Sequence, residues 1–137
     1  MYISQPPDVE GALASFLGDA LGVVGIPGRT PPEFPERSVQ VVSTGGSKIN
    51  EAIYSAPVSV DLRISGLESE AIQTGNPMAG MIARLGHTQN MGEVVVTRVE
   101  LQSLPYLNPD PLQPKLHRVT VNAVLTVKGH LVQIPQL

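Results

Sequence analysis

The stretch closest to a known chemical motif is Gly45-Gly46-Ser47-Lys48, which is similar to the end of a phosphate-binding loop. Such a loop reads G-x-x-x-x-G-K-[ST] and opens a helix, so that backbone amides and a lysine surround a phosphate. Here the first glycine is not in place, and no helical pattern follows Ile49. Because paired glycines commonly mark turns, the sequence favours a hairpin turn at 44–47 over a nucleotide site.

Three histidines, His87, His117 and His130, are the next candidates for chemistry. Their spacing brings no two of them onto one face at metal-ligand distance, and the chain has no cysteine to complete a zinc site. General acid–base catalysis needs a positioned partner, and the sequence identifies none. We therefore predict no metal and no cofactor, with each histidine on the surface or in a loop.

The acidic residues and serines give no catalytic pattern either. Glu68 and Glu70 are two residues apart, so on a helix they point in different directions. Asp61 and Arg63 share one face of an expected strand, where such residues ordinarily pair with charges on a neighbouring strand. No G-x-S-x-G sequence is present to activate a serine. The sequence therefore predicts a protein that is not an enzyme.

The elements that carry these residues are alternating strands. Over 58–64, apolar residues alternate with the polar residues Ser59, Asp61 and Arg63. This alternation predicts a strand with one buried face and one solvent-facing face. Similar patterns predict strands over 37–44, 93–101 and 117–128, and 23–26 is a further, short candidate.

Two helical regions are expected to cover this sheet. Apolar residues at helical spacing predict a helix over 7–21, with Pro6 and Pro7 in its first turn and Gly22 at its end. A second pattern over 67–85 is interrupted by Gly75-Asn76-Pro77, which predicts a short helix, a break and another helix. This order is typical of an α+β fold, an antiparallel or mixed sheet of about four strands with its helices packed on one face.

Length and composition limit the class of protein. The 137 residues are most simply one domain, and the 13 prolines and 13 glycines place much of it in turns and loops. A net charge of −3 argues against a protein whose main task is holding nucleic-acid phosphates. No apolar run reaches the roughly 18 residues of a membrane span, and 1–7 lacks a signal-peptide pattern, so we expect a cytosolic place of synthesis.

Two proline-rich loops, at about 27–36 and 104–114, are the candidate interaction sites, because proline stiffens them. The residues that we expect at an interface with a subunit or partner are Phe34, Leu104, Tyr106, Leu107, Asp110 and Leu112. Two interpretations stay open: the loops dock on another chain, or they fold back on their own domain. The tail, 130–137, is expected to fray or to dock on a neighbour.

Three stretches follow one another in a recognisable order. Residues 37–47 hold a V-x-V-x-x-T-G-G strand and turn, 56–63 a strand after an Ala-Pro turn, and 104–129 a Pro-Asp loop before an alternating strand that ends in glycine. In this order and spacing the chain resembles the tail terminator proteins of long-tailed, siphovirus-type bacteriophages, especially those of actinobacteria. It departs from them at Asp61-Leu62, where many relatives carry Cys-Trp, and at Gly75-Asn76-Pro77, where their helix is usually continuous.

The resemblance implies a tail-terminator-like fold and a virion structural protein of the tail and neck, assembled in the host cytoplasm. Its copies would form a ring, expected to be a hexamer, that caps the tail tube, stops its polymerisation and joins the tail to the head. The implied partners are the chain itself, the tail tube protein and the head–tail connector or stopper protein. Viral DNA would cross the lumen without specific binding, and no membrane is involved. We hypothesise that the loop 104–114 reaches a neighbouring subunit or the tube.

Two alternatives stay open. The first is another head–tail neck component, such as a head-completion or stopper protein. The second is a small hydrolase or ligand-binding domain that uses His117 or the turn at 44–48. A pocket that joins His117 to an acidic partner would favour this second alternative.

Overall fold

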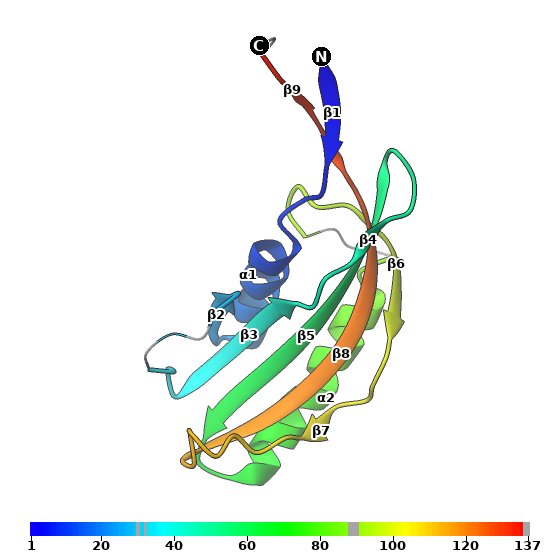
Figure 1. Cartoon of the computed structure of the whole chain (residues 1–137). Helices are drawn as coiled ribbons and strands as arrows, with labels where there is room; N and C mark the ends of the chain where they lie inside the picture. The colour runs from blue at the N-terminus through cyan, green and yellow to red at the C-terminus, as the bar shows by residue number, and fades with distance from the viewer. Residues whose placement is uncertain (30, 32, 88–90, 136–137) are drawn as a thin grey trace.

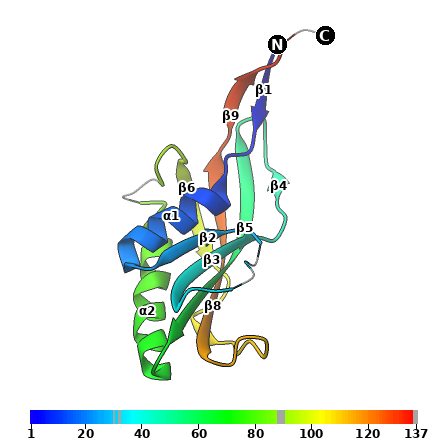
Figure 2. The same cartoon turned by 90° about the vertical axis from the view of Figure 1, so that its left-hand side faces the viewer.

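A curved, mostly antiparallel sheet carries both helices of the chain on one face, so the fold is α+β (Figures 1 and 2). The computed structural model describes residues 1–29, 31, 33–87 and 91–135. The elements in chain order are β1 (Tyr2–Gln5), α1 (Val9–Leu21), β2 (Val24–Pro27), β3 (Arg37–Ser43), β4 (Ser47–Lys48), β5 (Ile53–Ser65), α2 (Glu68–Arg84), β6 (Val96–Leu101), β7 (Tyr106–Leu107), β8 (Leu116–Lys128) and β9 (His130–Gln133).

The main sheet has seven strands, more than the four or so that alternation predicts. Its path runs β2-β3-β5-β8-β6, with β4 also paired to β5 and β7 to β8. The two longest strands, β5 and β8, pair over their whole length. The additional strands β2, β4 and β7 have only two to four residues, too few to display a period of two. Of these, β2 confirms the short candidate at 23–26, and it runs parallel to β3.

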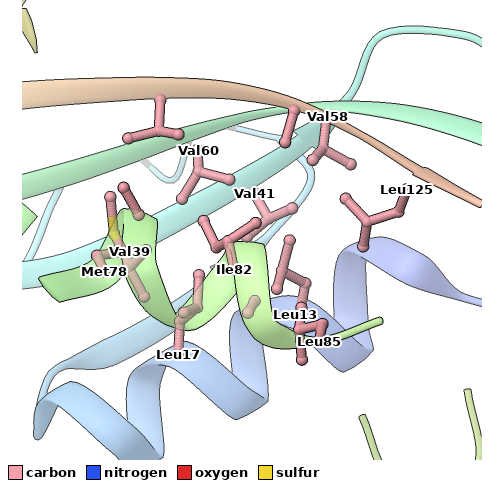
Figure 3. Close-up of a cluster of buried hydrophobic side chains, with 14 of the residues drawn as sticks. Leu13, Leu17, Val39, Val41, Val58, Val60, Met78, Ile82, Leu85 and Leu125 are labelled. Carbon is pink, nitrogen blue, oxygen red and sulfur yellow. The ribbon is translucent and has the colours of Figure 1, made fainter. Parts of the chain in front are cut away.

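The core lies between the sheet and the two helices. Val58, Val60, Leu62 and Ile64 of β5 are buried, as their alternation predicts. Figure 3 shows Val58 and Val60 pointing from the sheet toward helix residues such as Leu13 and Ile82. The core is aliphatic, and its packing fixes which face of each strand turns inward.

Helix α1 has clear stop and start signals. The Asp8 carboxylate accepts a hydrogen bond from the Gly11 amide at 3.0 Å, which caps the first turn. Gly22 ends the helix in the left-handed conformation, with φ of 67°. The predicted end is therefore confirmed. The start is shifted, because Pro6 and Pro7 precede the Asp8 cap rather than lying in the first turn.

The predicted break at Gly75-Asn76-Pro77 is wrong, because α2 is one continuous helix with Pro77 inside it. Pro77 and Asn76 lie on the exposed side, whereas Gly75 and Met78 are buried against the sheet. Packing of the buried side offsets the hydrogen bond that proline removes from the ladder. Tertiary contacts thus override a local break signal.

Of the two outcomes predicted for 130–137, fraying is wrong for 130–133, whereas docking on a neighbour stays a prediction. Residues 130–133 form β9, which pairs antiparallel with β1 of the same chain in a separate two-stranded sheet. This ribbon stands away from the body (Figures 1 and 2). Residues 136–137 lie outside the described part of the chain.

We predict opposite effects for two glycine substitutions within α2. A Cβ at Gly75 would lie 2.8 Å from Cγ1 of the buried Val119, whereas a Cβ at Gly80 meets nothing within 4 Å. Gly75→Ala should therefore lower the free energy of unfolding by about 1–3 kcal/mol through overpacking. Gly80→Ala should raise it by up to about 1 kcal/mol through helix propensity. Urea denaturation of both variants measures the change in the free energy of unfolding. An equal change in the two variants would contradict the packing of α2 on β8.

Candidate functional site

The outer face of the sheet, opposite the helices, is not simply solvent-facing as the alternation in 58–64 predicts. Arg63 of β5 is only 3% exposed there, and its neighbours Ser38, Gln40 and Thr120 are also buried. Buried arginine is rare unless it is paired, because removal of a charge from water is costly. The cover over this face comes from the two proline-rich loops.

Arg63 is held by polar groups from three parts of the chain. Its Nη1 donates to Gln40 Oε1 of β3 at 2.9 Å. Its Nη2 lies 3.9 Å from Asp61 Oδ2 of the same strand and 3.7 Å from Asp110 Oδ2 of the loop 104–114. The prediction that Asp61 and Arg63 pair with charges on a neighbouring strand is thus replaced by pairing with each other and with a loop.

The other proline-rich loop reaches the same guanidinium through an aromatic ring. The Phe34 centroid lies 3.8 Å from Arg63 Cζ, a cation–π stack. One buried side chain therefore contacts both loops, which lie far apart in the sequence. This is direct evidence that both loops fold back on their own domain.

Asp110 also resolves a conflict between two strands. Arg63 and Arg118 are register partners in β5 and β8, so two like charges lie opposite each other. Asp110 Oδ2 lies 3.7 Å from Arg118 Nη1 as well as from Arg63 Nη2, so one carboxylate faces both cations. Arg118 Nε in turn donates to the Asn108 carbonyl oxygen at 2.6 Å. These contacts hold the loop in one position.

A row of hydrogen bonds extends this network across the sheet. The Thr120 hydroxyl donates to Asp61 Oδ1 at 2.6 Å, and Asn108 Nδ2 donates to Thr120 Oγ1 at 3.1 Å. Burial lowers the pKa of the Arg63 guanidinium, and the charge of Arg118 adds to this, while Asp61 and Asp110 oppose it. Arginine remains protonated in proteins, so the network keeps its charge. This network holds the two loops in place and does not exchange protons. We call it the anchor, and it consists of Phe34, Gln40, Asp61, Arg63, Asn108, Asp110, Arg118 and Thr120.

The anchor divides the six expected interface residues into two groups. Phe34 and Asp110 face inward and bind Arg63. The other four form an exposed set, which we call the loop surface: Leu104, Tyr106, Leu107 and Leu112. Leu104 is 77% exposed and Leu112 is 85% exposed. Asp110 is the only charged side chain in the loop 104–114, so the loop surface itself carries no charge.

The alternative of a hydrolase or ligand-binding domain that uses His117 has only a small cavity to support it. A cavity of about 120 Å³ is lined by Glu68, Asp110 and His117 among others, so His117 does lie near acidic groups. His117 Nε2, however, is 2.9 Å from the Gly66 carbonyl oxygen, and Asp110 is paired with arginines. Ligand pockets usually measure about 300–1,000 Å³, so this hollow is small for a substrate.

The glycine segment 45–48 lines a larger, open cavity of about 410 Å³ beside the start of α1. Its one lysine, Lys48, is bound by Glu51 at 3.1 Å on the surface. Residues 44–46 join β3 to β4, and both strands pair with β5, so the hairpin turn predicted at 44–47 is wrong and the chain reverses between β4 and β5 instead. No helix follows this stretch directly, as predicted. The first turn of α1 lines the cavity as well, but Asp8 and Glu10 place two carboxylates there, which disfavours a phosphate.

Within the described ranges, no three His, Asp or Glu side chains come close enough to hold a metal ion. Neither described helix is long and apolar enough to cross a membrane. In comparisons with known proteins, no family model matches the chain, and no curated protein is significantly similar to it.

The residues that sequence reasoning missed are Gln40, Asn108 and Arg118, which complete the anchor. The sequence offered one signal, a charged pair two residues apart in an otherwise uncharged strand. It could not show which strand lies opposite Arg63, because that depends on the pairing of segments more than 50 residues apart.

We predict that the anchor is essential for stability. Arg63→Ala leaves Asp61 and Asp110 without their buried partner and should cost about 3–5 kcal/mol of unfolding free energy. Lys48→Ala removes an exposed ion pair and should change it by less than about 0.5 kcal/mol. Chemical denaturation compares the two variants. An Arg63→Ala protein as stable as the Lys48→Ala protein would rule out the anchor.

Proposed function

We propose that this chain is a phage tail terminator whose copies form a ring that caps the tail tube and joins the tail to the head. The order of three sequence stretches supports the family, and the loop surface supports association as the way in which the chain works. The continuous α2 also removes one of the two departures from the family's layout. The proposed partners are other copies, the tube protein and the head–tail connector or stopper protein.

The observation that carries the proposal is the pair of exposed, uncharged surfaces at opposite ends of the subunit. The loop surface lies at one end, beside β7, and the β1–β9 ribbon lies at the other end (Figures 1 and 2). Soluble monomers rarely expose grouped apolar side chains, and such groups often mark interaction sites. Two different surfaces on one subunit permit head-to-tail contacts, which close into a ring when the rotation fits.

The anchor explains how the loop can present such a surface. Leu104 and Leu112 gain nothing from exposure to water, yet Asp110 and Asn108 hold the loop between them in place. A pre-positioned loop loses little conformational entropy when a partner binds. This arrangement suits assembly better than it suits catalysis.

A terminator and another neck protein would be found on different parts of the unfinished virion. Presence on isolated headless tails favours a terminator, and presence on tailless heads favours a head-completion or stopper protein. The hollow at His117 is a feature that favours a hydrolase, and turnover that is lost in His117→Ala would revive that alternative.

We predict that Leu104→Ser combined with Leu112→Ser prevents assembly without unfolding the subunit. Both side chains are exposed and make no core contacts, so stability should change by no more than about 0.5 kcal/mol. Light scattering should give about 87 kDa for the natural ring, six times the chain mass of 14.5 kDa, and a much smaller mass for the variant. Point substitutions are preferable to deletion of 106–111, which would also remove Asn108 and Asp110.

Ile49→Ser is the matched control, because Ile49 is an exposed apolar residue in the β4–β5 turn, away from the loop surface. It should leave the ring mass unchanged. A natural chain that stays monomeric at high concentration, and is absent from virion tails by electron microscopy, would refute the proposed function. A ring that survives the double substitution would refute the role of the loop surface alone.

A further inference from the structure

The β1–β9 ribbon is the part of the fold least attached to the body. Its register joins Tyr2 to Gln133 and Ser4 to Leu131, and the Met1 carbonyl oxygen accepts from the Ile134 amide at 2.8 Å. No residue of β1 or β9 is buried, with Tyr2 67% and Leu131 78% exposed. An isolated two-stranded ribbon is only marginally stable in water.

β1 contributes little to the rest of the molecule. Apart from its ladder with β9, its side-chain hydrogen bond in the described structure joins Ser4 Oγ to Tyr54 OH at 3.1 Å. None of the core residues comes from β1 or β9. The body is therefore complete without β1, and the partner that β1 needs is a copy of β9 with Tyr54 beside it.

The segment that joins β1 to α1 is built to keep β1 extended. Gln5 is followed by Pro6 and Pro7, and Asp8 then caps the helix. Proline fixes its own φ and disfavours helical conformations in the residue before it, so 5–7 favours an extended path. A stiff, extended connection directs β1 away from the body of the subunit.

We infer that β1 of each subunit pairs with β9 of the next subunit in the ring, so that neighbours exchange strands. The inference rests on the proposed function. An exchanged ladder has the same register and the same Tyr54 contact as the closed one, so no native hydrogen bond is lost. Once subunits are held side by side, the high effective concentration offsets the entropy of association.

The composition of the ribbon removes an obstacle to this exchange. Segments 1–7 and 130–137 contain no Asp, Glu, Lys or Arg. Copies can therefore meet through these segments without like-charge repulsion between side chains. Exchange also makes the ribbon a contact between subunits.

The test uses the absence of cysteine from the chain, because two introduced thiols are then the only ones present. Ser4 and Leu131 are register partners, and the Met1–Ile134 bond places them at a non-hydrogen-bonded pair. Cα atoms of such a pair lie about 4.5 Å apart, within the range for a disulfide. The Ser4→Cys/Leu131→Cys double variant is assembled at the concentration that gives the ring, oxidised, and analysed by denaturing gel without reductant.

With exchange, most of the protein should shift from the 14.5 kDa monomer band to bands of two to six chains. With a closed ribbon, the disulfide forms within one chain and the protein stays at the monomer band, which would overturn the inference. The control is Ser4→Cys/Val132→Cys, whose thiols face opposite sides of the ribbon and should give little cross-linking. If the double variant does not fold, Ser4→Cys and Leu131→Cys single variants are refolded together, and exchange predicts a mixed disulfide between them.

Light scattering of the unoxidised sample separates this inference from the proposed function. A ring mass with monomer bands overturns strand exchange and leaves the ring in place. A mass of two chains with dimer bands supports exchange and overturns the ring. A monomer mass with monomer bands overturns both.

Discussion

The burial of one guanidinium on the outer face of the sheet is the constraint on which the surface of this fold depends. A charge placed there must be compensated by nearby groups, because water is excluded. Gln40 and Asp61 supply part of this compensation from the sheet, and Phe34 and Asp110 supply the rest from two distant loops. The loops therefore have a fixed place for an electrostatic reason, to which the pairing of β7 with β8 adds in the loop 104–114. Replacement of such a network by apolar residues can be neutral for stability in other proteins, so its value here is in fixing one arrangement of the loops.

The parts of the fold that the sequence predicts are those whose signals are local. The alternation in β5 and β8 and the Gly22 stop of α1 depend on neighbouring residues alone, and the structure confirms them. The α+β class follows from the order of such elements. The break in α2 was predicted from Pro77, a local signal, and failed because the buried side of that helix includes Ala71, Met78 and Ile82. β1 and β9 were missed because four-residue strands pair across nearly the whole chain.

The candidate site shows a different limit of prediction from a single sequence. Phe34 and Asp110 were selected as interface residues because they lie on stiff loops, and their loops are indeed positioned by specific contacts. Those contacts are with Arg63, within the same chain, and depend on Arg118 lying opposite Arg63. Strand register is a property of the folded sheet, so a single sequence cannot show that two arginines need a shared carboxylate. The exposure of Leu104 and Leu112 follows from this, since the same loop turns Asp110 inward and these leucines outward.

In the proposed ring, rigid loops would connect the anchor to the contact between subunits. A proposed ring of six closes only if each head-to-tail contact rotates the next subunit by about 60°, and a different rotation gives an open filament or another ring size. A loop that could shift relative to the sheet would let this angle vary from one contact to the next. The charges on Arg63, Asp110 and Arg118 lie on the outer face near one end of the β5–β8 ladder, and they tie the loop to these two strands, the longest of the sheet. The orientation of the loop surface is thereby fixed relative to β5 and β8. In this view the buried ions act on assembly through geometry, because they fix the angle at which one copy meets the next.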